Sequence, residues 1–175
     1  MASDDFLELL RGTKRSAVHL EMRDVYAVSD EDEGFKRWKN GHRLDESDRQ
    51  SWWRPWLTLM QDTIARGVVV RRARIVSEPV TEYIRYEHSF TFTNVAAGEQ
   101  VRWLPRRLAS DLALPGNDFW LFDDTAVMFN IWTGDGDWAE NGREVRTEPA
   151  VVQLCSSSFE SVWDRATPHA VYQIH

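Results

Sequence analysis

The chain has 175 residues, 42% of them hydrophobic and 12% aromatic, so it can bury one sizeable core and we expect one domain. Its net charge of −7 argues against direct binding to nucleic acid or to an anionic membrane, because affinity for phosphates comes from cations. A single cysteine excludes an intrachain disulfide, and no stretch approaches the roughly 18 apolar residues of a spanning helix. The acidic start of the chain does not resemble a secretory signal, so we expect a cytoplasmic protein.

The first third of the chain carries alternating helix and strand signals. In chain order we expect a short amphipathic helix, a strand, a second helix, a polar loop and a longer helix at residues 5–11, 16–22, 33–40, 41–50 and 54–66. Gly67 stops the longer helix, and the short connection that follows is typical of alternating helices and strands.

The remainder of the chain begins with the strongest strand signal, the β-branched run at residues 68–77. We then expect a helix at 80–93 with Pro79 in its first turn, a strand at 100–104 and an ambiguous stretch at 106–113. Two strands at 119–122 and 125–133 follow, then an acidic loop at 135–147 and a last helix that begins at 148–149. This order predicts an α/β fold, with one mixed sheet flanked by helices.

Five phrases of the sequence carry a resemblance to a known family. They are HLEMRD at 19–24, RRARIVSEP at 71–79, YIRYEH at 83–88, RWLPRR at 102–107 and LPGNDFWLFD at 114–123. With them the chain resembles an actinobacterial family that carries a domain of unknown function (DUF6879-like). Members are often encoded beside helix-turn-helix transcriptional regulators, so the resemblance implies such a regulator as a partner. It supplies no activity.

A second resemblance covers residues 56–166. The order of helix, strand, helix, strand, hairpin and a final helix with Phe159, Trp163 and Ala166 is similar to one half of a phospholipase-D-like fold, in particular to its non-catalytic copies. It implies a single domain over residues 1–175, made of an N-terminal portion (1–53) and a phospholipase-D-like core (54–175). Since phospholipase-D-like sites are built from two halves, it also implies a homodimer.

The hairpin of phospholipase-D-like domains carries the motif His-x-Lys-x-x-x-x-Asp. If Asp123 stands for the Asp of that motif, Gly116 occupies the His position and Asp118 the Lys position. A covalent route needs the nucleophilic imidazole and its cationic neighbour, and both are replaced. The resemblance therefore implies no catalytic residue, and Asp123 is interpreted as a residue of the hairpin turn.

The arginines form the most interesting group of polar residues. Arg72 and Arg74 share one face of their predicted strand, and an arginine-lined pocket at strand ends would suit a small anionic ligand with a carboxylate or phosphate group. The candidate ligand-binding residues are Arg72, Arg74, Glu78, Tyr83, Arg85, Glu87, His88, Arg102, Arg106, Asn117 and Asp118. The alternative is internal ion pairing, and it stays open because the acids Glu78, Glu82, Glu87, Asp118 and Asp123 could neutralise the same arginines.

A small-molecule enzyme is the alternative function. It would use His19, Glu21, Glu87 and His88, which two neighbouring elements could bring together. No spacing typical of metal ligands supports a metal site, so neither a metal nor a cofactor is expected. Cys155 falls on the apolar face of its helix, which indicates a buried, inert thiol.

Four tryptophans are hard to place in the core. Trp52 and Trp53 precede Pro55, while Trp132 and Trp138 flank the acidic loop. Such aromatic residues serve as anchors of protein interfaces. The sequence thus favours a non-catalytic binding or regulatory protein, which contacts a helix-turn-helix regulator or a second copy of itself.

Overall fold

The computed structural model describes residues 4–26 and 29–175, and the side chains of residues 29–32 are also outside the description. The strands are β1 (Ser16–Glu21), β2 (Val69–Val76), β3 (Gln100–Pro105), β4 (Phe119–Phe122), β5 (Ala126–Trp132), β6 (Trp138–Arg146) and β7 (Thr167–Pro168). The helices are α1 (Asp4–Gly12), α2 (Ser29–Lys39), α3 (Arg49–Trp52), α4 (Pro55–Ala65), α5 (Glu82–Phe90), α6 (Phe92–Ala96), η1 (Arg106–Ala109) and α7 (Pro149–Arg165).

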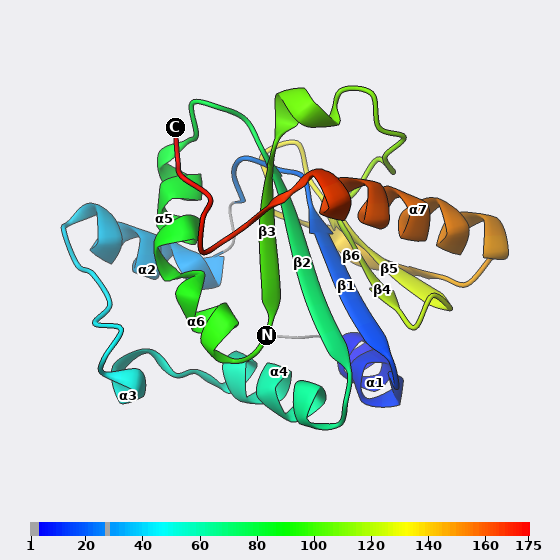
Figure 1. The fold of residues 1–175 in the computed structure, drawn as a ribbon, viewed down its shortest axis with the longest axis horizontal. Helices are drawn as coiled ribbons and strands as arrows, with labels where there is room; N and C mark the ends of the chain where they lie inside the picture. The colour runs from blue at the N-terminus through cyan, green and yellow to red at the C-terminus, as the bar shows by residue number, and fades with distance from the viewer. Residues whose placement is uncertain (1–3, 27–28) are drawn as a thin grey trace.

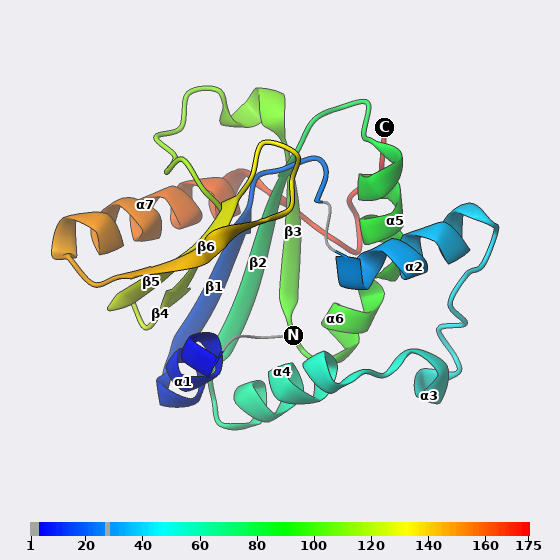
Figure 2. The ribbon, with the colours of Figure 1, turned by 180° about the vertical axis from the view of Figure 1, so that it is seen from behind.

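The strands form one seven-stranded sheet in the order β6-β5-β4-β1-β2-β3-β7, with helices around it (Figures 1 and 2). The pairs β1–β2 and β2–β3 are parallel, and the other neighbours are antiparallel. The predicted α/β fold with a mixed, helix-flanked sheet is therefore confirmed. The N-terminal portion contributes β1, the strand at the centre of the sheet.

One face of the sheet, called the α7 face, is apolar. Val18 and Leu20 of β1 lie beside Ala73 and Ile75 of β2, and Phe159 of α7 packs on them as part of one buried cluster. The apolar residues of α7 recur three or four positions apart, as on one side of a helix, which is why this helix lies along the sheet (Figure 1). Cys155 is fully buried in this cluster.

The opposite face, called the α5 face, is covered in two parts. At one end, α1 and α4 pack through Phe6 and Met60 against Val70 and Trp120. At the other end, α5 and the C-terminal segment cover Trp103. Polar residues of β1 and β2 lie between these two apolar clusters, and they form the candidate site.

The hairpin between β4 and β5 turns through Asp123 and Asp124, as predicted. Both residues have positive φ, 51° and 54°, as a tight two-residue hairpin turn requires. The carboxylate of Asp123 also accepts hydrogen bonds from the backbone N–H groups of Lys14, Arg15 and Ser16, at 2.7–2.9 Å. Asp123 therefore fastens the segment that leads into β1.

One expectation for the second half of the chain was wrong, and one strand was missed. The acidic loop at 135–147 contains β6, an edge strand that pairs with β5. Residues on both of its sides are exposed, so the strand lacks the alternation that identifies half-buried strands. The short strand β7 was not predicted at all.

The helix expected at 80–93 is two helices, α5 and α6. Pro79 is outside it, because the side chain of Thr81 caps α5 by accepting a hydrogen bond from the N–H of Ile84 at 3.1 Å. The Thr91 hydroxyl donates to the Glu87 carbonyl at 2.7 Å, a contact that bends helices at their ends.

Two helices in the first third also differ from the expectation. α2 begins at Ser29 rather than at residue 33, and α3 occupies the end of the expected polar loop. Across the described residues, no helix is both long and apolar enough to cross a membrane.

Candidate functional site

The candidate site is a band of polar residues across the middle of the α5 face. Glu21 of β1 and Arg74 of β2 are register partners, and Trp103 of β3 is the next residue in the same row. His19 and Arg72 form the adjacent row. Side chains two residues apart on a strand share a face, so the pleat places all of them on the α5 face.

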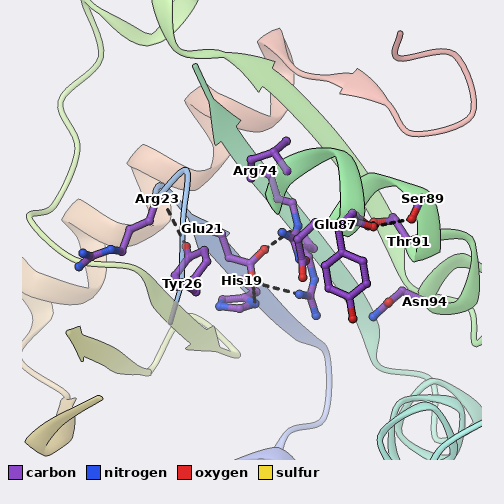
Figure 3. A network of polar contacts seen from close by, with 12 residues as sticks. His19, Glu21, Arg23, Tyr26, Arg74, Glu87, Ser89, Thr91 and Asn94 are labelled. Carbon is purple, nitrogen blue, oxygen red and sulfur yellow. Dashed lines mark hydrogen bonds and ion pairs between the residues drawn. The ribbon is translucent and has the colours of Figure 1, made fainter. Parts of the chain in front are cut away.

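Two arginines and three glutamates form a continuous ion-pair network in this band. Figure 3 labels Glu21, Arg74 and Glu87 of this network. The Glu21 carboxylate lies between both arginines, 3.0 Å from Nη1 of Arg72 and 2.7 Å from Nε of Arg74. Arg72 also donates from Nε to Glu99 at 2.7 Å, and Arg74 pairs with Glu87 of α5. The contact between Glu21 Oε2 and Arg74 Nε lacks hydrogen-bond geometry, so it is a purely electrostatic contact.

Burial and the ion pairs act in opposite directions on the pKa values of Glu21, Arg72 and Arg74. Burial alone would raise the pKa of Glu21, but Arg74 and Arg72 lower that pKa to about 2. Burial likewise opposes the charge on both arginines, and the neighbouring carboxylates nevertheless raise the pKa of Arg72 and of Arg74. Glu21, Arg72 and Arg74 are therefore charged at neutral pH, and the two guanidinium groups face carboxylates of the same chain.

His19 lies beside this network without joining it by a hydrogen bond. Its ring stacks on Trp120, with centroids 4.3 Å apart, and Nδ1 is 3.6 Å from Oε1 of Glu21. Neither ring nitrogen has a hydrogen-bond partner among the described residues. Burial lowers the pKa of His19 to about 3, so the imidazole is neutral.

The four residues of the alternative enzyme site are only partly assembled. Glu21 and Glu87 are joined through Arg74. His88 instead packs against His169, at 4.6 Å between ring centroids, and against Trp103. Within residues 4–26 and 29–175, no three His, Cys, Asp or Glu side chains gather as metal ligands would.

Asp118, at the position of the motif lysine, is buried at the start of β4. Its Oδ2 accepts a hydrogen bond from the Tyr26 hydroxyl at 2.5 Å, and its Oδ1 accepts one from the Met22 N–H at 2.7 Å. Burial raises the pKa of Asp118 to about 6. The carboxyl thus holds the segment that follows β1, while Gly116 is exposed.

Arg106 joins the carboxyl ends of the parallel strands. Its Nη2 donates to the carbonyls of Met22 and Ile75, at 2.6 and 3.2 Å, and its Nε donates to Ser77 Oγ at 2.9 Å. A cleft of about 320 Å³ lies beside it. The lining residues of that cleft are Ser77, Glu78, Pro105, Arg106, Arg107 and Ser110.

The remaining candidate residues lie elsewhere. Tyr83 is buried in the apolar cluster under α5, and Arg85 and Asn117 are exposed. Arg102 donates to the Trp163 carbonyl at 2.9 Å and stacks on that ring, on the α7 face. Of the predicted ligand-binding residues, the network itself contains Arg72, Arg74 and Glu87.

Sequence reasoning missed three members of the site: Glu99, Asn94 and Tyr26. Asn94 donates to Glu99 Oε2 at 2.7 Å, and Glu99 is almost fully buried. The signal that could have found Glu99 is its position directly before β3. Because β3 pairs in parallel with β2, this position lies within reach of Arg72.

The four tryptophans occupy two separate surfaces. Trp52 donates from Nε1 to the Asp45 carbonyl, and Trp53 donates from Nε1 to Thr58 Oγ1, both beside α3. Trp132 and Trp138 stack at 3.9 Å on the β5–β6 hairpin, and Trp138 is 37% exposed. The two ribbon views show α3 and that hairpin in different parts of the molecule (Figures 1 and 2).

The family model described as "Domain of unknown function (DUF6879)" matches residues 4–174. The chain belongs to this family. No curated protein matches it in sequence.

Solved structures establish the kind of fold. The phospholipase D family member Nuc from Salmonella typhimurium is similar with a TM-score of 0.50 and 10% identity, over 93% of this chain and 86% of Nuc. NucT from Helicobacter pylori is similar with a TM-score of 0.51 and 8% identity, over 93% and 87%. The archaeal chromatin protein TrmBL2, whose structure shows a novel mode of DNA binding, gives a TM-score of 0.50 and 10% identity, over 93% of this chain and 49% of TrmBL2. At these identities the likeness concerns the fold, which is phospholipase-D-like.

Proposed function

We propose that this protein is a non-catalytic binding and regulatory module on a phospholipase-D-like fold, and that its partner is another protein. The partner is a helix-turn-helix transcriptional regulator or a second copy of the chain. The first follows from the family resemblance, and the second from the two-half construction of phospholipase-D-like sites.

One observation carries the non-catalytic part of the proposal. The hairpin positions for the motif His and Lys hold Gly116 and Asp118, and the Asp118 carboxyl is engaged with Tyr26 and the Met22 backbone. A carboxylate repels the phosphate that a lysine would bind, and glycine offers no nucleophile. The three lysines of the chain are Lys14, Lys36 and Lys39, all outside the sheet.

Two features support a protein partner. The stacked pair Trp132 and Trp138 leaves an indole partly exposed on an edge strand, and indoles are frequent anchors of interfaces. The net charge of −7 disfavours nucleic acid as a direct ligand, although the fold neighbour TrmBL2 binds DNA.

The test has two arms with purified protein. In the first, bis(4-nitrophenyl) phosphate is the substrate, and we expect no hydrolysis above the buffer rate; turnover that disappears on mutation of this chain would overturn the non-catalytic assignment.

In the second, the tagged protein is purified from its own cells, and Trp138→Ala is expected to lose the bound protein while its thermal unfolding stays cooperative. Val171→Ala, at an exposed apolar residue that belongs to neither tryptophan pair, is the control.

A second candidate function is sensing of a small anion at the 320 Å³ cleft. The favouring observation is the exposed guanidinium of Arg107, whose Nε is 3.7 Å from Glu78, at the carboxyl ends of parallel strands. Inorganic phosphate or citrate should then raise the unfolding temperature. This rise should vanish in Arg107→Ala and persist in Arg11→Ala, and an equal rise in both variants would exclude the cleft.

A further inference from the structure

Residues 34–54 form a layer outside α5 and α6, which we call the outer layer. It contains the end of α2, a loop and α3, and the three lie at the periphery of the molecule (Figure 1). The layer holds six Lys or Arg residues against three Asp or Glu residues, in a chain whose net charge is −7. It is therefore a basic region on an acidic protein.

Four of the six cations of the outer layer lie over aromatic rings. Arg49 lies over Trp53, with 3.8 Å from the guanidinium carbon to the ring centroid, and Arg43 lies over Trp38 at 4.6 Å. Lys39 lies over Phe35 at 4.5 Å, and Arg54 over Phe90 of α5 at 5.3 Å. Of the nine cation–ring contacts among the described residues, four lie in this short segment.

The rings beneath these cations are fixed to the rest of the fold. Phe35 contacts Tyr86 of α5 at 5.3 Å between centroids, and Trp38 contacts the same tyrosine at 6.0 Å. Trp52 meets Phe92 of α6 edge-on at 5.3 Å. The inner sides of the aromatic rings are therefore packed, and the cations cover their outer sides.

Lys39, Arg43 and Arg49 are exposed, and none of them forms an ion pair with a carboxylate among the described residues. Arg43 donates only to the carbonyls of Trp38 and His42, at 2.7 and 2.8 Å. This contrasts with Arg72 and Arg74, which face buried carboxylates. Lys39, Arg43 and Arg49 are thus placed on aromatic rings, and no carboxylate among the described residues forms an ion pair with them.

We propose that the outer layer is the docking surface for an acidic segment of the partner protein. The inference rests on the proposed function and specifies the chemistry of the partner at the surface that contains Trp52 and Trp53. Guanidinium groups accept carboxylates in a planar, bidentate arrangement, and groups already held on rings lose less conformational freedom on binding.

A single-stranded nucleic acid is the competing occupant, and one observation disfavours it. Bases bind such proteins by stacking on free aromatic faces, and here Arg43 and Arg49 occupy the faces of Trp38 and Trp53.

Fluorescence anisotropy of a labelled peptide of alternating Glu and Ser tests the proposal directly. The full chain should bind this probe at low salt and release it as salt rises, because exposed charges are screened. The charge-reversing pair Arg43→Glu with Arg49→Glu should weaken binding about tenfold or more. The matched control is Arg11→Glu with Lys14→Glu, two exposed cations outside the layer, which changes the net charge equally and should leave binding within about twofold.

Two further measurements separate the outcomes. Arg49→Lys keeps the charge but loses the planar group, so it should weaken binding less than the reversal and more than the control. Tighter binding of an oligothymidine than of the peptide at the same salt concentration would overturn the proposal in favour of nucleic acid. Equal binding by the reversal and control pairs would also overturn it.

If the reversed protein still co-purifies with its native partner, the outer layer is excluded while the binding function stands; if the unaltered protein has no partner, the proposed function itself fails.

Discussion

Glu21 and Arg74 are register partners on the adjacent parallel strands β1 and β2, and Glu21 Oε2 lies 2.7 Å from Arg74 Nε. The same carboxylate reaches Arg72 at 3.0 Å. One acidic side chain from the central strand therefore balances two buried guanidinium groups. The pairing lies on the α5 face, and the side chains of Glu21, Arg72 and Arg74 are all largely buried there.

Removal of this charge should be costly. We expect Glu21→Gln to lower the free energy of unfolding by about 3–5 kcal/mol, because two buried cations lose a shared partner. Urea denaturation at neutral pH measures the change. Glu160→Gln is the control: Glu160 pairs with Arg71 at 2.6 Å but is half exposed, so its loss should cost about 0–1 kcal/mol. Equal effects of the two changes would contradict the buried network.

Asp118 should give stability an unusual dependence on pH. Its folded pKa of about 6 lies above the ordinary value of 3.8, so the folded state binds the proton more tightly. The stability that the protonated Asp118 carboxyl contributes to the folded state is therefore fully present below about pH 4 and is lost as pH rises to 6. Relative to the unaltered protein, Asp118→Asn should gain stability over that range, by roughly 3 kcal/mol at most.

Urea denaturation of both proteins from pH 4 to 7 checks this prediction, and the carbon-13 chemical shift of the Asp118 carboxyl reports its titration directly. Asp124→Asn, at an exposed turn residue, should show no such trend. A constant difference between Asp118→Asn and the unaltered protein across the range would contradict it.

Asp123 should contribute to stability through the three N–H groups that it accepts. Asp123→Asn keeps the left-handed turn, which asparagine tolerates, but removes the charge and one acceptor oxygen. We expect a loss of about 1–2 kcal/mol. Arg15 and Ser16 donate to Oδ1, which asparagine retains, whereas Lys14 donates to Oδ2, so hydrogen exchange of the Lys14 amide should accelerate most. Asp124→Asn should leave that amide protected.

Cys155 should be chemically inert in the folded protein. Burial raises the pKa of its thiol to about 11, and the side chain lies inside the α7 face. Labelling by 5,5′-dithiobis(2-nitrobenzoic acid) at pH 8 should thus proceed only at the rate of unfolding. Labelling should become immediate in denaturant, and fast labelling without denaturant would show that the thiol is accessible.

Local sequence patterns predicted the elements that have one buried side. β2 and the β4–β5 hairpin have strongly apolar faces, and α7 repeats its apolar residues at helical spacing. β6 was not predicted because both of its sides are largely exposed, so its sequence shows neither an apolar run nor an alternation of apolar and polar residues. The same limit applies to α3, a single turn of polar and aromatic residues.

The partners in the candidate site depend on strand register, which the sequence does not state. The pleat predicted that Arg72 and Arg74 share a face, and this follows from strand geometry alone. That Arg72 meets Glu99, 27 residues away, depends on the parallel alignment of β2 with β3 and on the turn before β3. The Tyr26 contact with Asp118 spans 92 residues and has no local signal.

The central place of β1 has a consequence for how the molecule is made. As the chain leaves the ribosome, β1 emerges first, but one of its edges stays open until β4 has been synthesised, because Ala17 pairs with Phe122. Folding is therefore delayed to a late stage of translation, and an incomplete chain exposes a bare apolar strand to aggregation. Chaperones that shield nascent chains would find their target in this interval.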